Sequence, residues 1–427
     1  MLFNFLYCSV IRLYVLTAFL MQFFSPKAAK WINGQRIVWK SLAADLPEKT
    51  KGKRIWIHCA SLGEFEQGRP MIEMAKQNMD GVQIILTFFS PSGYEVRKNF
   101  PLADRVFYLP ADTTENARRF INLIQPDIAV FVKYEIWWNY LNELKKQQIP
   151  ALLISAVFRP QQFYFRWYGM GYRQALTFFK MIFVQNESSR LLLNQFGIHQ
   201  TKVAPDSRFD RVWSIAQEKK SLYIPELFAG TGQTIMVCGS TWPKDETLLA
   251  KAMKLLPDNL SLIIAPHETD NSRIESLEAC FQNLNPIRYS QALENQAFLN
   301  NPKQFRVLIL DNMGILATVY RYGQLAYIGG GFGAGIHNIL EAVVYGVPVF
   351  FGPRFSKFNE AVTLVQLGGA FAADNPETLA DNILKGYPGT KAYQHVTAVC
   401  NRYIKENIGG TALVYQELIR LLNKTDY

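Results

Sequence analysis

The sequence predicts an α/β protein of two Rossmann-like, doubly wound domains facing a cleft, with an N-terminal membrane anchor helix. Three observations predict this. The chain has 427 residues, too many for one ordinary hydrophobic core. Short apolar runs alternate with longer helical stretches, and the alternation restarts near Thr234. The first 25 residues are dominated by Leu, Phe, Val, Ile, Tyr and Met.

Continuous apolar runs, in contrast to alternating ones, indicate strands buried on both faces of a parallel sheet. We expect strands in the first half at 54–59, 82–88, 106–109, 128–132, 151–155, 181–185 and 202–204. In the second half we expect them at 234–238, 260–265, 306–310, 325–328 and 348–351. The expected domains are therefore 26–215 and 216–395, with a charged linker at 218–225 and C-terminal helices at 396–427 that can cross back to the first domain.

The apolar run over residues 1–24 is broken only by residues such as Asn4 and Arg12 and barely reaches the length of a spanning helix. No small-residue cleavage site follows it, so residues 1–25 predict an uncleaved anchor. The basic residues after it favour a cytoplasmic body. An amphipathic helix lying in the membrane interface, with Arg12 reaching the headgroups, is an equal alternative. Either arrangement tethers the protein to a membrane.

Composition limits the classes of molecule that we expect the protein to bind. The formal net charge of +10 suits anionic partners, whether nucleic acid, phosphorylated ligands or an acidic bilayer. Five scattered cysteines indicate a reduced, cytosolic compartment, and five unclustered histidines do not support a metal site. Segment 158–168 mixes aromatic residues with arginines. That mixture suits membrane headgroups, single-stranded nucleic acid or simple core packing.

The segment from His58 to Phe65 joins a predicted strand to a predicted helix. Glu64 then lies near the first helical turn, where the helix dipole favours an ionised carboxylate. Such a carboxylate suits a base that accepts a proton, and Gly63 allows close approach to the backbone. The alternative is structural, because Ser61 and Glu64 have the spacing of a capping box. The spacing by itself favours the capping box.

A second candidate is the glycine-rich segment 327–341, in which a strand runs into five glycines and then a helix. Bare backbone amides and a helix N-terminus bind phosphate, and this is our interpretation of the segment. Asn338 and Glu341 share one helix face in this reading, and the carboxylate can hold ribose hydroxyls. The alternative is a turn whose glycines serve only close packing.

Dinucleotide oxidoreductases also use such a turn, but they need an acidic residue at the end of the next strand. The strand at 348–351 has none there, which weakens a dehydrogenase reading. Three further turns, at 239–242, 266–268 and 311–315, suit one nucleotide site at the same sheet edge. Near the domain junction, Arg208 can neutralise a phosphate leaving group or pair with Asp206 or Asp210.

Taken in order, these segments resemble the 3-deoxy-D-manno-octulosonic acid (Kdo) transferases of lipid A assembly. The resemblance covers nearly the whole chain. It is carried by the N-terminal anchor and by the segments 60–65, 87–93, 134–137, 239–241 and 337–341. No single segment is specific, but their order and spacing are.

The resemblance implies the two-domain GT-B glycosyltransferase fold, with 26–215 binding the acceptor and 216–395 the donor. It implies transfer of Kdo from CMP-Kdo to a lipid A precursor (lipid IVA) with inversion, without a metal or other cofactor. The implied location is the inner membrane, in contact with its lipids, with the catalytic domains on the cytoplasmic side. No nucleic-acid partner is expected.

Carried over residue by residue, Glu64 matches the family's general base, which deprotonates the acceptor hydroxyl. Arg208 falls where the family usually has Lys, and both cations can offset charge on the leaving phosphate. The positions that match the CMP-binding turns are Pro266, His267, Met313, Gly314, Ile315, Asn338, Ile339, Leu340 and Glu341.

Two departures from the family pattern bear on the site. Lys133 stands where the family usually has the first Glu of Glu-x-Glu-x-Trp, a carboxylate assigned to transition-state stabilisation, and Glu135 can assume part of that role. Pro266-His267 stands where the family commonly has Pro-Arg-His. The alternatives are another GT-B enzyme with a different nucleotide sugar, and a non-catalytic basic binder of membranes or nucleic acid.

Overall fold

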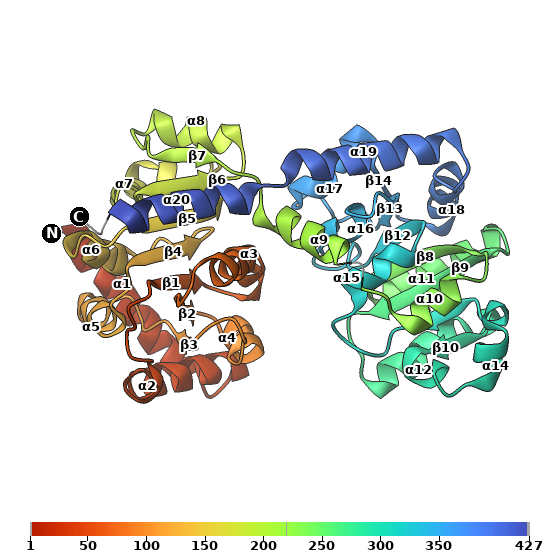
Figure 1. Ribbon diagram of the computed structural model, residues 1–427, viewed down its shortest axis with the longest axis horizontal. Coiled ribbons are helices and arrows are strands. Elements are labelled where there is room, and N and C mark those ends of the chain that lie inside the picture. Colours follow the sequence, from red (N-terminus) through yellow and green to blue (C-terminus); the bar gives the residue numbers. More distant parts are fainter. Residues whose placement is uncertain (1, 219, 425–427) are drawn as a thin grey trace. The chain divides into compact units, whose positions relative to one another are not determined.

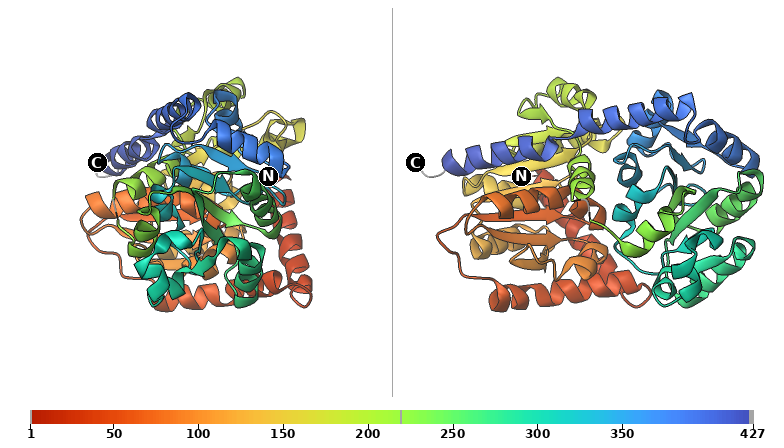
Figure 2. Two further views of the ribbon diagram at one scale, coloured as in Figure 1. Left: turned by 90° about the vertical axis from the view of Figure 1, so that its right-hand side faces the viewer. Right: turned by 45° about the vertical axis from the view of Figure 1, so that its right-hand side comes forward.

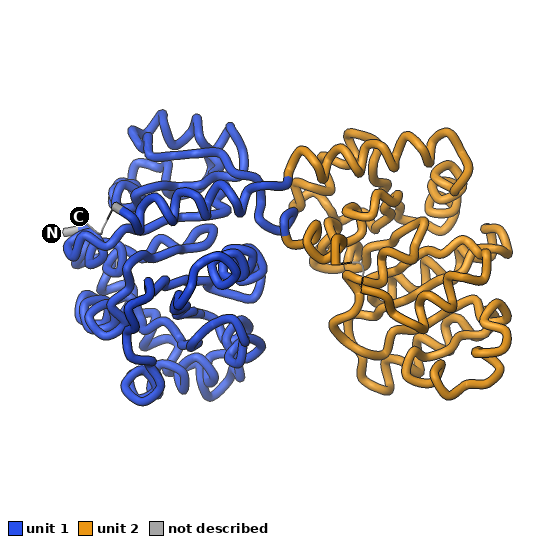
Figure 3. Tube along the Cα trace, viewed as in Figure 1, with its two compact units in different colours: residues 1–210, 408–427 blue, residues 211–407 orange. Residues whose placement is uncertain are grey.

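The protein is described by a computed structural model, which covers residues 2–218 and 220–424. The chain forms two compact units (Figure 3). Unit 1 comprises residues 1–210 and 408–427, and unit 2 comprises residues 211–407. The expected cleft between the domains stays a prediction.

Unit 1 is built on a seven-stranded parallel sheet in the order β3-β2-β1-β4-β5-β6-β7 (Figure 1). Its strands are β1 (Arg54–Cys59), β2 (Gln83–Phe88), β3 (Arg105–Tyr108), β4 (Ile128–Val132), β5 (Ala151–Ala156), β6 (Met181–Val184) and β7 (Thr201–Val203). The strand order reverses direction between β1 and β4, and ligands of open parallel sheets bind at the carboxyl ends of strands beside such a switch.

Burial on both faces explains the continuous apolar strands. Ile55 and Ile57 of β1 point into one core, while Trp56 between them points into the other. The helices of this unit are α1 (Leu2–Met21), α2 (Pro26–Asp45), α3 (Leu62–Asn78), α4 (Pro91–Arg97), α5 (Thr114–Ile124), α6 (Trp138–Lys146), α7 (Met170–Leu176), α8 (Glu187–Gln195) and α20 (Gly410–Lys424). The helix α9 (Ser207–Gln217) runs from unit 1 into unit 2.

The two ends of the chain both pack on unit 1. The C-terminal helix α20 runs along this unit (Figures 1 and 2), and its Val414 and Leu418 are buried in the same core as Phe65 of α3. Tyr7 of α1 is buried in the opposite core. The preceding helix α19 (Lys391–Asn407) belongs to unit 2, so the expected C-terminal segment 396–427 is divided between the two units.

Unit 2 repeats the architecture with a seven-stranded parallel sheet in the order β10-β11-β9-β8-β12-β13-β14. Its strands are β8 (Thr234–Thr241), β9 (Leu260–Pro266), β10 (Pro286–Arg288), β11 (Val307–Ile309), β12 (Leu325–Ile328), β13 (Val349–Phe351) and β14 (Ala370–Ala372). Besides α19, its helices are α10 (Tyr223–Ala229), α11 (Pro243–Ala252), α12 (Asn271–Cys280), α13 (Tyr289–Ala292), α14 (Gln296–Asn300), α15 (Leu316–Val319), α16 (Leu340–Val343), α17 (Asn359–Leu367) and α18 (Pro376–Lys385).

The chain has two domains of alternating strands and helices, as expected. All but two of their strands were predicted from the sequence. The edge strands β10 and β14 were not predicted; each has three residues, of which only one is buried. The expected linker at 218–225 is wrong in position. The two units divide at Asp210–Arg211 and Asn407–Ile408, and α10 already begins at Tyr223.

The predicted anchor is an α-helix of suitable composition. The stretch Phe3–Met21, 19 residues with a mean hydropathy of 1.6, is long and apolar enough to cross a membrane, and only 6% of it is buried. Helices of this kind also occur as signal sequences and in soluble cores, so length and composition leave its placement open.

Candidate active site

In unit 1 the candidate residues gather where the strand order reverses. His58 of β1 is paired in register with Phe131 of β4, and these strands continue into the turns that carry Glu64 and Glu135. Because parallel strands end at one edge of the sheet, both carboxylates belong to the edge where α/β proteins bind ligands.

Glu64 lies in the first turn of α3, a 17-residue helix, and its side chain is half-buried. The Ser61 hydroxyl donates a hydrogen bond to the Glu64 carboxylate. Ser61 makes no side-chain capping bond to the helix backbone, so the capping-box interpretation is wrong at this position. A Cβ at Gly63 would meet only the Ser61 hydroxyl, at 3.8 Å. The arrangement orients a carboxylate beside open backbone, as a general base requires.

Glu135 is held by two neighbours. Its Oε2 accepts a hydrogen bond from the Trp137 indole N–H at 2.7 Å, and it lies 3.2 Å from Nε2 of the fully buried His58. His58 Nδ1 in turn lies 2.9 Å from the Thr87 hydroxyl. This chain of contacts fixes the Glu135 carboxylate and joins the ends of β1, β2 and β4.

Lys133 follows β4 with a positive φ of 64°. A residue with a Cβ in the left-handed region is strained, and such strain concentrates at functional sites. Its backbone N–H bonds the Ile154 carbonyl at 2.8 Å, which holds the turn in place. Ser155, at the end of the neighbouring β5, has a φ of 56°. Both strained residues therefore lie at the same sheet edge as Glu64.

Arg208 is paired with Asp206, one of the alternatives that the sequence left open. Its Nη2 lies 2.9 Å from Asp206 Oδ2, and the same carboxylate accepts hydrogen bonds from Gln67 and Gln185. Burial raises the pKa of Asp206, but the Arg208 charge and these hydrogen bonds outweigh burial, so the pKa lies below its ordinary value. The Asp206 carboxylate, held by these hydrogen bonds, thus balances the charge of Arg208.

In unit 2 the strand order reverses between β8 and β12, beside the glycine-rich segment. The turns predicted after β8, β9 and β11 lie at this same edge, because their strands are neighbours in the sheet. Ser240, at the end of β8, adopts a positive φ of 54°. This edge has the position of a nucleotide site in doubly wound folds.

Close packing explains most of the glycines. A Cβ at Gly329 would lie 2.2 Å from the Ser240 carbonyl oxygen, and one at Gly331 would lie 2.6 Å from Gly352 Cα. Gly330 and Gly335 have positive φ values of 93° and 137°. At Gly333 a Cβ would meet only the Gly330 carbonyl oxygen at 3.6 Å. The packing alternative therefore holds for four of the five glycines, whatever else the turn binds.

The helix after this turn is shorter than expected. α16 begins at Leu340 and has four residues, so Asn338 and Ile339 precede it and do not share a helix face with Glu341. A helix this short supplies little dipole. Asn338 Nδ2 instead donates to Glu341 Oε1 at 3.0 Å. The two residues form a local pair at the turn.

Three rings stack at the same edge. The His267 ring lies 4.6 Å from both the Trp242 and His337 rings, and the Trp242 indole N–H donates to His337 Nε2 at 3.2 Å. Burial, with His267 nearby, lowers the pKa of His337. His267 is exposed and follows Pro266 of β9.

The remaining predicted turn is open to solvent. Met313 is exposed, Gly314 has a positive φ of 93° and Ile315 caps α15. Among the described residues, no group of three or more His, Cys, Asp or Glu side chains could hold a metal ion.

Sequence reasoning missed Asp245 and the role of His58. Asp245 is buried in α11, and its carboxylate accepts hydrogen bonds at 2.9 Å from the Gly330 amide, the Trp242 amide and the Tyr327 hydroxyl. Burial raises its pKa. The Trp242-Pro243-Lys244-Asp245 spacing of a helix N-terminus was visible, but its tie to a turn 85 residues away was not.

Comparisons with known proteins point to one group of transferases. A family model described as 3-deoxy-D-manno-octulosonic-acid transferase (kdotransferase) matches residues 34–211, most of unit 1. A transferase of that name from Chlamydophila psittaci is 25% identical over 359 residues, covering 78% of this chain and 81% of its own. One from Aquifex aeolicus is 26% identical over 322 residues, covering 74% and 80%.

Among solved structures, UDP-GlcNAc 2-epimerase from Neisseria meningitidis bound to UDP-GlcNAc aligns with a TM-score of 0.59 at 14% identity. The alignment covers 87% of this chain and 100% of the epimerase, and it shows the fold alone. Two doubly wound units in one chain are the GT-B architecture. Over both units, the chain is thus similar to 3-deoxy-D-manno-octulosonic acid transferases.

Proposed function

We propose that the protein transfers Kdo from CMP-Kdo to a lipid A precursor, with inversion at the anomeric carbon. The observation that carries the proposal is the Glu64 carboxylate, held by the Ser61 hydroxyl at the first turn of α3. The first turn of a helix is a favourable place for a negative charge. The carboxylate can then take the proton from the acceptor hydroxyl as that oxygen attacks the donor carbon.

Unit 2 supplies the donor site in this proposal. The ring stack of Trp242, His267 and His337 offers a face for the cytosine, and base–aromatic stacking is tolerant of geometry. The Asn338–Glu341 pair presents polar groups to ribose hydroxyls, and the glycine turn exposes backbone to the phosphate. No metal takes part in the proposed step.

A donor panel tests the proposal. Purified protein is given CMP-Kdo, UDP-sugars or GDP-sugars with an acylated lipid A precursor, and nucleotide release is followed together with acceptor modification. Only CMP-Kdo should turn over, and NMR of the product should show the anomeric configuration opposite to that of the donor. Turnover of a UDP- or GDP-sugar instead would assign the site to another GT-B activity, and retention would exclude a single direct displacement by the acceptor hydroxyl.

We also propose that α1 lies in the interface of the inner membrane, on its cytoplasmic side, and does not span it. The Tyr7 hydroxyl donates to the buried Asp112 carboxylate at 2.7 Å. The Phe3 ring, at the start of the helix, lies 4.8 Å from the Trp138 ring, and the Tyr14 ring, in its second half, lies 5.3 Å from the Trp31 ring. A spanning helix would have to break these contacts.

The opposite face of α1 is apolar and exposed, as an interfacial helix requires. Its outward residues include Phe5, Leu6, Val10, Leu13, Leu16 and Leu20. The segment with Trp167 and Met170, 88% and 70% exposed, adjoins the start of α1, where a Cβ at Gly171 would collide with the Phe3 ring. In membrane vesicles, cysteines placed at residues 2 and 23 should react with an impermeant reagent from the same side. Reaction from opposite sides would mean a spanning helix.

A further inference from the structure

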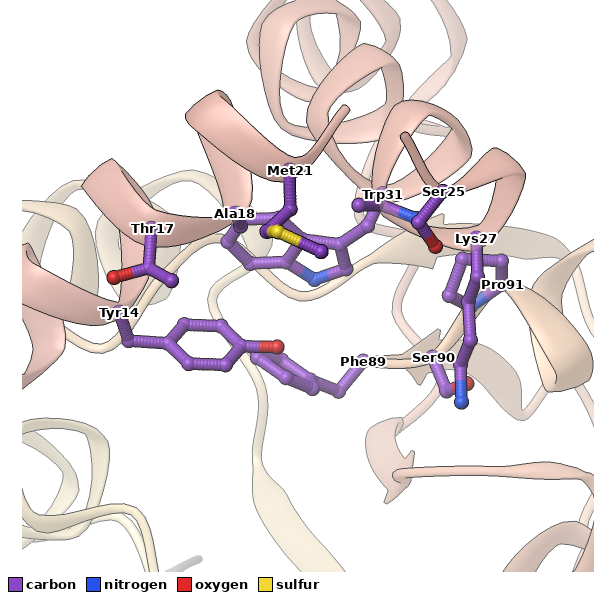
Figure 4. A pocket seen from close by; sticks show the side chains of 11 residues that line it. Tyr14, Thr17, Ala18, Met21, Ser25, Lys27, Trp31, Phe89, Ser90 and Pro91 are labelled. Carbon is purple, nitrogen blue, oxygen red and sulfur yellow. The ribbon is translucent and has the colours of Figure 1, made fainter. Parts of the chain in front are cut away.

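Unit 1 contains a pocket that takes no part in the candidate active site described above. The helices α1 and α2 and the turn between β2 and α4 enclose it, with a cavity volume of about 360 Å³. That volume lies at the low end of small-molecule sites, roughly 300–1,000 Å³. Its lining residues are Tyr14, Thr17, Ala18, Met21, Ser25, Lys27, Ala28, Trp31, Phe89, Ser90 and Pro91. Figure 4 shows these side chains around the pocket.

The pocket is apolar but contains one unsatisfied donor. Trp31 is 3% exposed, and its indole N–H has no hydrogen-bond partner among the residues that the structure describes. In Figure 4 the indole lies by Met21, with Tyr14 and Phe89 across the pocket from it. Buried donors are nearly always paired, and an orphan beside a cavity is completed when a ligand brings an acceptor oxygen. The occupant is therefore an apolar group that carries an oxygen.

One end of the pocket carries a positive charge. Lys27 and Ser90 lie at the same end in Figure 4, with the ammonium group toward Ser90. Lys27 is exposed, and within the described parts of the chain no carboxylate pairs with it. An ammonium group without a partner favours the polar or anionic end of a ligand. The pocket thus fits an amphiphile: a chain inside and a headgroup at Lys27.

The pocket adjoins the turn that carries Glu64. Cys59 and Phe88 end β1 and β2 in register, and the Ser90 amide donates to the Ala60 carbonyl at 2.7 Å. On its other side, the Phe89 ring lies 4.8 Å from the Trp137 ring, whose N–H holds Glu135. A ligand in this pocket therefore has its headgroup end beside the turns of both candidate carboxylates.

We propose that this pocket binds one acyl chain of the lipid acceptor, so that the chain positions the sugar hydroxyl for Glu64. The chain lies between α1 and Phe89, a carbonyl oxygen near its base accepts from the Trp31 indole, and Lys27 meets an anionic group of the lipid. The inference rests on the proposed function, because it assumes a lipid acceptor. The apolar outer face of α1 borders the bilayer from which the chain enters.

Filling the pocket tests the proposal. Ala28→Phe puts a ring into the pocket, and Ala44→Phe makes the same change at an exposed site on the same helix α2. For each protein, kcat/KM is measured with the acylated acceptor and with its deacylated, water-soluble sugar. Ala28→Phe should lower the acylated-to-deacylated ratio at least about tenfold, since several buried methylene groups are lost. Ala44→Phe should leave the ratio at its wild-type value.

Trp31→Phe keeps an aromatic ring but removes the N–H together with the second ring of the indole. It should raise KM for the acylated acceptor at least about 2- to 10-fold, the effect of one hydrogen bond, with kcat little changed. This variant keeps the test decisive if Ala28→Phe does not fold.

The outcomes separate the two proposals. If the wild-type protein transfers Kdo to neither acceptor, the proposed function fails. If it transfers Kdo to the acylated acceptor and both pocket variants keep wild-type ratios and KM, the acyl-chain site is overturned while the function stands. An equal loss on both acceptors would also overturn it, because the pocket would then serve folding.

Discussion

The two units share one topology but use the reversal of strand order differently. In unit 1 that edge carries ionisable side chains on half-buried positions: Glu64 held by Ser61, and Glu135 held by Trp137 and His58. In unit 2 the carboxylate at the same position, Asp245, accepts three hydrogen bonds from within the unit. The groups that remain at this edge of unit 2 are backbone atoms and the stacked rings of Trp242, His267 and His337. The difference supports the proposal that unit 1 performs proton transfer and unit 2 binds the nucleotide.

The largest effect is expected in unit 1. Glu64→Gln removes the proton acceptor but keeps the shape of the side chain, so kcat should fall roughly 10²- to 10⁴-fold. CMP affinity, measured by calorimetry, should stay near the wild-type value. Glu66→Gln is the matched control, since Glu66 lies in the same helix and pairs with Arg97 at the surface. A variant at Glu64 with near-normal kcat would end the assignment of the base.

The next effect belongs to unit 2. His267→Ala removes the ring that stacks on both Trp242 and His337. The Kd for CMP should therefore rise roughly 5- to 100-fold, the usual range for one base–aromatic contact. The rate of a single turnover at saturating donor should change much less. A lowered rate at saturation with unchanged Kd would place His267 in the chemistry and would break the division of labour.

Glycine substitutions separate packing from binding in unit 2. Gly329→Ala places a Cβ against the Ser240 carbonyl and should reduce the free energy of unfolding by about 1–3 kcal/mol. Gly333→Ala, in the same turn, makes only an ordinary contact with the Gly330 carbonyl oxygen and should leave stability unchanged. Denaturant unfolding measures both. Equal stability of the two variants would contradict the packing explanation of the turn.

The units should also respond oppositely to pH. Burial raises the pKa of Asp112 in unit 1 to about 7, so the folded state holds this proton more tightly than the unfolded state. Stability from this group therefore falls as the pH rises from about 4 to about 7. Burial lowers the pKa of His337 in unit 2 from its ordinary value of 6.5, so its contribution is lost as the pH falls below that value.

The pH effect is measured by thermal unfolding of the wild-type protein and of Asp112→Asn and His337→Phe. Within its window each group changes stability by at most about 1.4 kcal/mol per pH unit. Asp112→Asn should flatten the loss toward neutral pH, and His337→Phe should flatten the loss in acid. Parallel curves for a variant and the wild-type protein would mean that its group does not titrate as inferred.

The smallest effect concerns strain at Lys133. Its φ of 64° costs about 1–3 kcal/mol for a residue with a Cβ, which Lys133→Gly relieves at an entropic cost of about 0.4–1 kcal/mol. We expect a net gain of about 1 kcal/mol, or a rise in Tm of about 2–4 °C, together with lower activity. A rise in Tm without any loss of activity would remove Lys133 from the site.

Local patterns predicted most of the fold and part of the site. Continuous apolar strands such as Ile128–Val132 announced the two parallel sheets, because burial on both faces leaves a long signal. The Glu64 turn was found, but its spacing favoured a cap, and only coordinates reveal that the Ser61 hydroxyl points at the carboxylate instead. Contacts between distant segments, such as His58 with Glu135 or Tyr7 with Asp112, leave no local pattern to read.

The proposed transfer of Kdo is tested most directly by the mass of the lipid product. An acylated lipid A precursor is incubated with CMP-Kdo and the wild-type protein and is then analysed by mass spectrometry. If the protein transfers Kdo, the precursor should gain the mass of at least one Kdo residue while CMP is released. An unchanged precursor, beside a known transferase that modifies it in the same mixture, would contradict the proposal.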